Sequence, residues 1–146
     1  MTPPAPRWSD EELRARHARQ QRLCAALESI ADALPHAVKP CMVAHARALI
    51  ADYMNFVATM GWPAGDRAES AADNIVDDLF EERRKDVFLA EEVAEALSAW
   101  SCGEGRLTPD AMGYLLRSLF DRLRQQMALE TDFLSRLSQG PRRRLH

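Results

Sequence analysis

Apolar residues recur at alternating spacings of three and four along four segments of the chain, which is the pattern of helices that bury one face. The first predicted helix opens at Ser9, which forms a capping box with Glu12, and it stops before Pro35. The second starts near Pro40, a residue suited to a first helical turn, and ends at Gly61-Trp62-Pro63. Short breaks of this kind separate helices that lie next to one another.

The other two helices are marked in the same way. The third is predicted from a capping box at Asp66 and Glu69 to Trp100. The fourth begins at Thr108-Pro109-Asp110, a cap followed by a proline, and is expected to end at Gly140-Pro141. No segment alternates with a period of two over a useful length, so no strand is predicted. The pattern favours an all-α fold, an antiparallel up-down four-helix bundle.

We expect a single bundle domain over residues 9–140, with an N-terminal tail of residues 1–8 and a basic C-terminal tail of residues 141–146. A chain of 146 residues that is 47% hydrophobic can bury one core without help from a metal or a disulfide. No run approaches the ~18 apolar residues of a membrane span, and the first residues lack the apolar stretch of a secretory signal. The expectation is therefore a protein without membrane association.

Charge and cysteine content indicate the kind of partner and the cellular location. A net charge of −3 argues against nucleic acid as a dominant partner. Three cysteines cannot all pair, which favours a cytoplasmic location, and Cys24 and Cys41 are expected in the core. His36 and His45 are expected on the surface. The segment 66–95 is rich in acidic residues, and we expect it to lie beside the more basic first and fourth helices.

Polar residues interrupt the apolar faces of three predicted helices. They are His17 and Gln20 in the first helix, Glu82 and Asp86 in the third, and Gln126 and Glu130 in the fourth. Arg83 directly follows Glu82 and lies next to the apolar face of the third helix. The second helix is uniformly apolar at the matching positions, Val43, Ala46, Ile50, Met54 and Val57. A buried carboxylate costs several kcal/mol unless it is paired or bound to a metal. We therefore expect an interior polar cluster that includes ionisable groups from three helices.

The helix sequences resemble those of the hemerythrin-like (HHE cation-binding) domains. LRARHARQQRLCAALESIADALP is similar to the first helix of that family, LFEERRKDVFLAEEVAEAL to the third, and RLRQQMALETDFLSRL to the fourth. The resemblance covers nearly the whole chain after Trp8. It implies an antiparallel four-helix bundle and a non-haem di-iron centre, held by histidines and carboxylates, that binds or senses oxygen, nitric oxide or iron.

Few of the ligands that the resemblance implies are present in this chain. His17 matches the histidine of the first helix, and Glu130 matches the carboxylate of the fourth. Gln126 stands where the fourth helix of the family has a histidine, and Arg83, followed by Asp86, stands where the third helix has one. Most of the imidazole ligands of a di-iron centre are thus missing.

The second helix lacks a counterpart of the family's His-x-x-x-Glu. Either Asn55 and Thr59 or Phe56 and Met60 occupy those positions, depending on the register. Trp62, together with Phe56, is expected to fill the space that would be open to water in a metal site.

The interior polar residues allow more than one interpretation. In one, Arg83 pairs with Asp86 or Glu130 and takes the place of the lost metal as the interior cation. In another, Arg83 extends along the bundle and reaches solvent. In a third, a residual metal site of His17, Asp86 and Glu130 binds a non-haem iron or another single divalent metal.

We therefore predict a hemerythrin-like domain that has lost most di-iron ligands, has no cofactor, is not an enzyme and works as a regulatory or interaction module. Its partner would be another protein or a second copy of the chain. One alternative is a metal-binding sensor or carrier of oxygen, nitric oxide or iron with an unusual site. Another is a binder of small molecules that uses the vacated cavity of the bundle, which a ligand-sized void lined by His17, Gln126 and Glu130 would favour.

Overall fold

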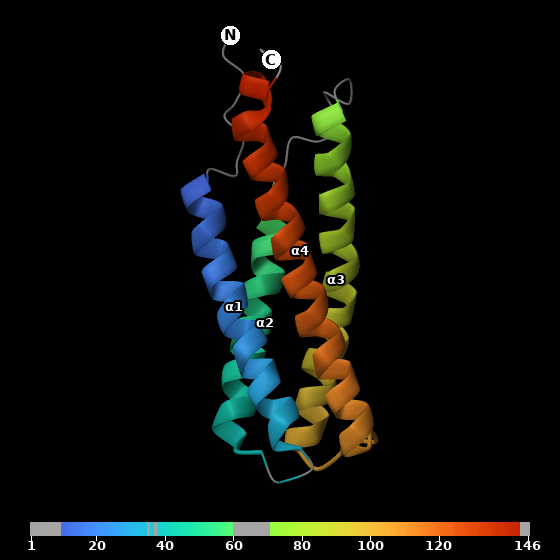
Figure 1. Ribbon diagram of the computed structural model, residues 1–146. Coiled ribbons are helices and arrows are strands. Elements are labelled where there is room, and N and C mark those ends of the chain that lie inside the picture. Colours follow the sequence, from blue (N-terminus) through green and yellow to red (C-terminus); the bar gives the residue numbers. More distant parts are fainter. Residues whose placement is uncertain (1–9, 35, 37, 60–70, 144–146) are drawn as a thin grey trace.

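The computed structural model of the protein contains four helices, α1 (Asp10–Ala33), α2 (Pro40–Thr59), α3 (Ala71–Ser101) and α4 (Pro109–Arg143) (Figure 1). It describes residues 10–34, 36, 38–59 and 71–143, and only the helical backbone of residues 10, 71–77 and 137–143. Consecutive helices run in opposite directions along one long axis (Figure 1). The predicted all-α antiparallel four-helix bundle is confirmed.

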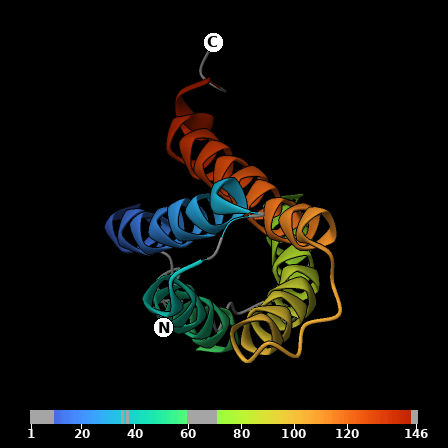
Figure 2. The same cartoon turned by 90° about the horizontal axis from the view of Figure 1, so that it is seen from below.

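Each helix packs against two others, and the contacting pairs are α1–α2, α2–α3, α3–α4 and α4–α1 (Figure 2). In the described part of the chain, α1 and α3 make no contact and lie diagonally across the bundle. The acidic α3 therefore lies beside the basic α4, as expected, but the expectation that it also lies beside α1 is wrong. In an up-down bundle sequence neighbours are also spatial neighbours, so the first and third helices are kept apart.

The helix ends agree with the predicted signals in some places and not in others. The backbone N–H of Ala111 donates to Thr108 Oγ1 at 3.1 Å, so Thr108 caps α4 as predicted. Gly103 follows the end of α3 with a φ of +73°, a conformation that glycine adopts without strain. The capping boxes expected at Ser9 and Asp66 lie outside the described residues, as do Met60 and Trp62.

The predicted end of the fourth helix at Gly140-Pro141 is wrong, because α4 continues to Arg143. Proline has no backbone N–H, so the helix loses one hydrogen bond at residue 141, but the backbone on either side stays helical. Residues 141–143, expected in the C-terminal tail, thus belong to α4. Within the described residues, no helix is long and apolar enough to cross a membrane.

The core is built from the predicted apolar faces and extends along the whole bundle. Its fully buried members include Leu27 of α1, Ile50 of α2, Val93 of α3 and Leu116 of α4. His36 and His45 are exposed, as predicted. Cys24 is buried, and burial raises the pKa of its thiol to about 11, so this thiol is inert at neutral pH.

The prediction that Cys41 lies in the core is wrong, because this cysteine is exposed. Cys41 is the second residue of α2, and the face of α2 that turns inward begins at Val43. A position in the first turn can therefore match the apolar pattern and still point away from the other helices.

Candidate functional site

A polar network lies inside the bundle, with Glu130 of α4 at its centre. The carboxylate is completely buried and accepts four hydrogen bonds on its two oxygens. His17 Nε2 of α1 donates to Oε1 at 2.8 Å, and Gln126 Nε2, one turn earlier on α4, donates to Oε2 at 3.3 Å. The other two donors come from Arg83 of α3. Because an ionised carboxylate offers about four lone-pair positions, Glu130 is saturated.

Arg83 supplies the positive charge of this centre. Its side chain is 0% exposed, which excludes the interpretation in which it reaches solvent. Nε donates to Glu130 Oε2 at 2.7 Å and Nη2 to Oε1, so the two planar groups meet through two parallel hydrogen bonds. Of the two predicted partners, Glu130 is therefore the one that Arg83 binds in the structure.

The second helix contributes Tyr53, a residue that the sequence analysis did not identify. Arg83 Nη1 donates to the Tyr53 hydroxyl at 3.2 Å, and the guanidinium lies 5.5 Å from the centroid of the Tyr53 ring. Phe56 packs on the same guanidinium at 5.9 Å. A signal was present in the sequence, because Tyr53 and Phe56 are spaced as one helical face with Ile50 and Val57.

The register of α2 follows from this arrangement. Asn55 and Thr59 are exposed, and the Thr59 hydroxyl donates to the carbonyl of Asn55 in its own helix at 2.9 Å. Phe56 is buried, so the row that contains Phe56 and not the row of Asn55 faces the polar network.

The inward face of α3 is wider than the predicted stripe, whose members Leu79, Asp86, Val93 and Leu97 are buried. The predicted stripe passed through Glu82 and Leu89, both of which are half-buried, whereas Arg83 and Ala90 are completely buried. The spacing of three and four residues passed through Glu82 and so placed Arg83 beside the stripe, although Arg83 is the residue that turns fully inward. Its pairing with Glu130 is what allows α3 to turn this position inward.

A second ion pair lies next to the first, between α3 and α4. Arg122 Nε donates to Asp86 Oδ1 at 3.0 Å, and Arg122 Nη2 donates to Glu82 Oε2 at 2.6 Å. Asp86 is 2% exposed, but the Arg122 side chain is 41% exposed and the Glu82 side chain 35%. Asp86 Oδ2 is buried and has no partner among the described residues. Glu82 is thus at the rim of the interior polar cluster and not inside it.

Arg122 was also missed by the sequence analysis. It precedes the core residue Leu123, at the edge of the apolar stripe of α4. The acidic character of α3 and the basic character of α4 were the available signal, and Arg122 is where these charges meet.

The two buried carboxylates have opposite pKa shifts. Burial alone would raise the pKa of Glu130, but the hydrogen bond from His17 and the charge of Arg83 outweigh it and hold the pKa below its usual value. Burial raises the pKa of Asp86, and the hydrogen bond and charge of Arg122 oppose this only in part. Burial would lower the pKa of Arg83, yet the Glu130 carboxylate raises it, so the guanidinium stays charged.

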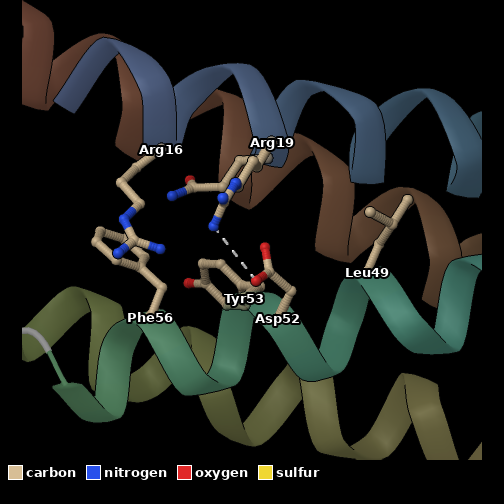
Figure 3. Close-up of a pocket in the computed structure, with 7 residues that line it drawn as sticks. Arg16, Arg19, Leu49, Asp52, Tyr53 and Phe56 are labelled. Atoms are coloured by element: carbon tan, nitrogen blue, oxygen red, sulfur yellow. Dashed lines mark ion pairs between the residues drawn. The ribbon is translucent and has the colours of Figure 1, made fainter. Parts of the chain in front are cut away.

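Gln20, one turn after His17 on α1, is 3% exposed, and its amide has no hydrogen-bond partner among the described residues. It lines a small pocket between α1 and α2 (Figure 3). In Figure 3, Arg16 and Arg19 extend from α1 towards Tyr53 and Phe56 of α2. Gln20 is therefore part of the interior, as predicted, but it belongs to this pocket and makes no bond to Glu130.

Outside the bundle, α1 and α4 border an open groove of about 620 Å³. His17 belongs to its lining, together with Met127, Thr131 and Ser135. The small-molecule alternative expected a void lined by His17, Gln126 and Glu130. This groove does not reach the last two, because Arg83 and its partners fill the centre of the bundle.

The arrangement of donors and acceptors does not suit a metal ion at the centre. All lone-pair positions of Glu130 are used, and the His17 nitrogen that faces Glu130 donates a hydrogen bond to it, so it has no lone pair for a metal. Asp86, the third predicted ligand, is bound to Arg122. Within the described residues, no group of three or more His, Cys, Asp or Glu side chains is placed to hold a metal.

Comparison with protein families, with curated proteins and with solved structures finds no match to this chain. The resemblance to hemerythrin-like domains therefore remains a prediction from the sequence. The four-helix bundle itself is shown by the structure.

Proposed function

We propose that this protein is a hemerythrin-like bundle in which an arginine replaces the metal, and that it works as a non-enzymatic regulatory or interaction module. The observation that carries the proposal is the double hydrogen bond between Arg83 and Glu130 in the middle of the bundle. These are the positions that the resemblance assigns to a metal-binding histidine and carboxylate. A fixed cation there supplies the charge compensation of a metal without its open coordination positions.

The chemistry of the interior supports a structural role. Arg83 cannot lose its proton at physiological pH, and Glu130 is held ionised by its partners, so neither group is suited to exchange protons at neutral pH. Cys24, the buried thiol, has a pKa of about 11 and is not a nucleophile at neutral pH. These properties favour a module whose function lies in its outer surface.

Exposed apolar side chains supply contact positions for a partner. Phe88 on α3 is 72% exposed and Tyr114 on α4 is 75% exposed. Single exposed aromatics are common on soluble proteins, so they indicate where a partner would be sought and not its identity. The partner in this proposal is another protein or a second copy of the chain.

Metal analysis tests the proposal directly. Protein purified after growth in iron-rich medium should carry well under one iron per chain and show no absorption from an oxo-bridged di-iron centre. Two irons per chain, lost on His17→Ala, would overturn the proposal.

A gain of metal binding would test the resemblance. The double variant Arg83→His and Gln126→His restores the two histidines that the resemblance expects, beside His17 and Glu130. We expect this variant to take up Fe²⁺ or Zn²⁺ in equilibrium dialysis. A matched control, Arg84→His with Gln125→His, places the same residues on exposed neighbouring positions and should not. Equal metal uptake by the two variants would contradict the assigned positions.

A further inference from the structure

The pocket between α1 and α2 is the place where the structure leaves polar groups without partners (Figure 3). Both polar atoms of the Gln20 amide are buried there and unbonded within the described part of the chain. A buried amide without hydrogen bonds is costly, so a native structure rarely keeps one without an occupant that bonds to it. The pocket is small, about 10 Å³, which is room for one species of about the size of a water molecule or a small ion.

The groups around this pocket are mainly hydrogen-bond donors. The Tyr53 hydroxyl accepts from Arg83, and its own proton has no acceptor among the described residues. Burial raises the pKa of Tyr53 to about 12, so the hydroxyl keeps this proton at neutral pH. The Gln20 amide nitrogen and the guanidinium of Arg16 are further donors.

The charge of the pocket lining is positive. Arg19 is paired with Asp52, with 3.6 Å between Nη1 and Oδ1. Arg16 lies 5.2 Å from the centroid of the Phe56 ring, and no carboxylate in the described residues pairs with it. Asp52 neutralises one of the two arginines, which leaves one positive charge beside the unbonded amide.

We propose that this pocket binds a small monovalent anion of about the size of chloride, held by Arg16, the Gln20 amide nitrogen and the Tyr53 hydroxyl. An anion accepts from all three donors, including the Gln20 amide nitrogen, and attracts the charge of Arg16. The Gln20 amide oxygen, itself an acceptor, gains no bond from the anion. A water could also bond the amide, but an anion adds an attraction to the guanidinium of Arg16, which is half-buried. This inference goes beyond the proposed function, since it assigns a ligand site away from Glu130.

The site is next to the polar network, and Tyr53 belongs to both. Its oxygen accepts from Arg83, and its proton is directed by whichever acceptor occupies the pocket. Occupation of the pocket therefore fixes the Tyr53 hydroxyl in the orientation that best receives the Arg83 hydrogen bond. Anion binding should stabilise the folded protein through this contact.

Bromide is a suitable probe because it is close to chloride in size and is visible by anomalous X-ray scattering. Crystals of the full chain grown in bromide should show an anomalous peak within hydrogen-bond distance of Gln20 and Tyr53. An ordered water at this position and no anomalous peak would overturn the proposal.

Thermal unfolding gives a second readout in solution. Bromide is titrated at constant ionic strength against the bulky sulfonate anion of HEPES. If bromide binds only to the folded state, the thermal unfolding midpoint should rise by about 3–5 °C at a bromide concentration ten times the dissociation constant. A midpoint that does not respond to bromide would contradict the site.

Two variants and one control separate the anion site from general packing. Arg16→Gln and Gln20→Leu should each abolish the response to bromide. Arg22→Gln removes the same charge from an exposed position on the same helix and should keep the response. If Gln20→Leu keeps the full response, the amide is not a ligand and the proposal fails. The outcome is independent of the metal content that tests the proposed function.

Discussion

Two buried carboxylates lie close together in this bundle, and each is bound to an arginine, yet their surroundings differ. Glu130 is bound by Arg83, which is itself completely buried, and all lone pairs of the carboxylate are used. Asp86 is bound by Arg122, which is 41% exposed, and one of its oxygens is unpartnered among the described residues. The pKa of Glu130 is lowered and that of Asp86 is raised. Burial penalises both charges, and the number and burial of the donors decide which carboxylate is stabilised.

The largest expected effect is the loss of the buried cation. Arg83→Met should destabilise the protein by about 3–5 kcal/mol, because Glu130 is left ionised and uncompensated in the core. Unfolding by urea, followed by circular dichroism, measures the change. Combining it with Glu130→Gln should recover part of the loss, since the uncompensated charge is removed.

The exposed neighbour Arg84 provides the control for this experiment. Arg84 is paired with Glu81 on the surface, so Arg84→Met should cost less than about 1 kcal/mol. Equal losses in Arg83→Met and Arg84→Met would show that the buried pair is not a special source of stability.

A smaller loss is expected from Tyr53→Phe. The substitution keeps the ring against the guanidinium but removes the oxygen that accepts from Arg83 Nη1. An unsatisfied hydrogen bond from a charged, buried donor should cost about 1.5–3 kcal/mol in denaturant unfolding. A loss below about 0.5 kcal/mol would mean that Arg83 finds another acceptor. Tyr53 would then add no stability to the polar network, and only α1, α3 and α4 would contribute to it.

Asp86→Asn should have the smallest effect, about 0–1 kcal/mol at neutral pH. The variant loses the ionic bond to Arg122, but it also removes a charge whose burial is only partly compensated, and Arg122 keeps Glu82. A loss as large as that in Arg83→Met would show that the two carboxylates are equivalent after all.

The two carboxylates should also affect stability with opposite signs as the pH changes. The pKa of Glu130 is lowered in the folded state, so its stabilisation is present above its ordinary value of 4.5 and is lost as the pH falls through the lower, folded pKa. The pKa of Asp86 is raised, so its charge destabilises the fold at high pH, and stability is gained as the pH falls through the raised pKa towards 3.8. Unfolding free energies of the wild type, Glu130→Gln and Asp86→Asn over acidic pH would resolve the two slopes. If Glu130 and Asp86 changed the unfolding free energy in the same direction as the pH falls, the opposite pKa shifts of the two carboxylates would be contradicted.

The sequence predicted the fold well because helical periodicity and helix caps are local. The spacing of the apolar positions in α4 named Gln126 and Glu130 as inward-facing, and both are buried. The same reasoning identified His17 and Gln20 on α1. It failed at the end of α4, where Gly140-Pro141 is a statistical stop signal that the helix passes.

The sequence by itself determined most of the residues that turn towards the core, with Cys41 and Tyr53 among the exceptions, and it predicted that buried acids require a cation. It could not determine which cation serves which acid. Arg83 is close in sequence to Asp86, but the structure pairs it with Glu130 of another helix and gives Asp86 to Arg122. Pairing of charges depends on the relative height and rotation of packed helices, which no local pattern contains. Tyr53 became part of the site for the same reason, because only the packing of α2 against α3 brings its hydroxyl to the guanidinium.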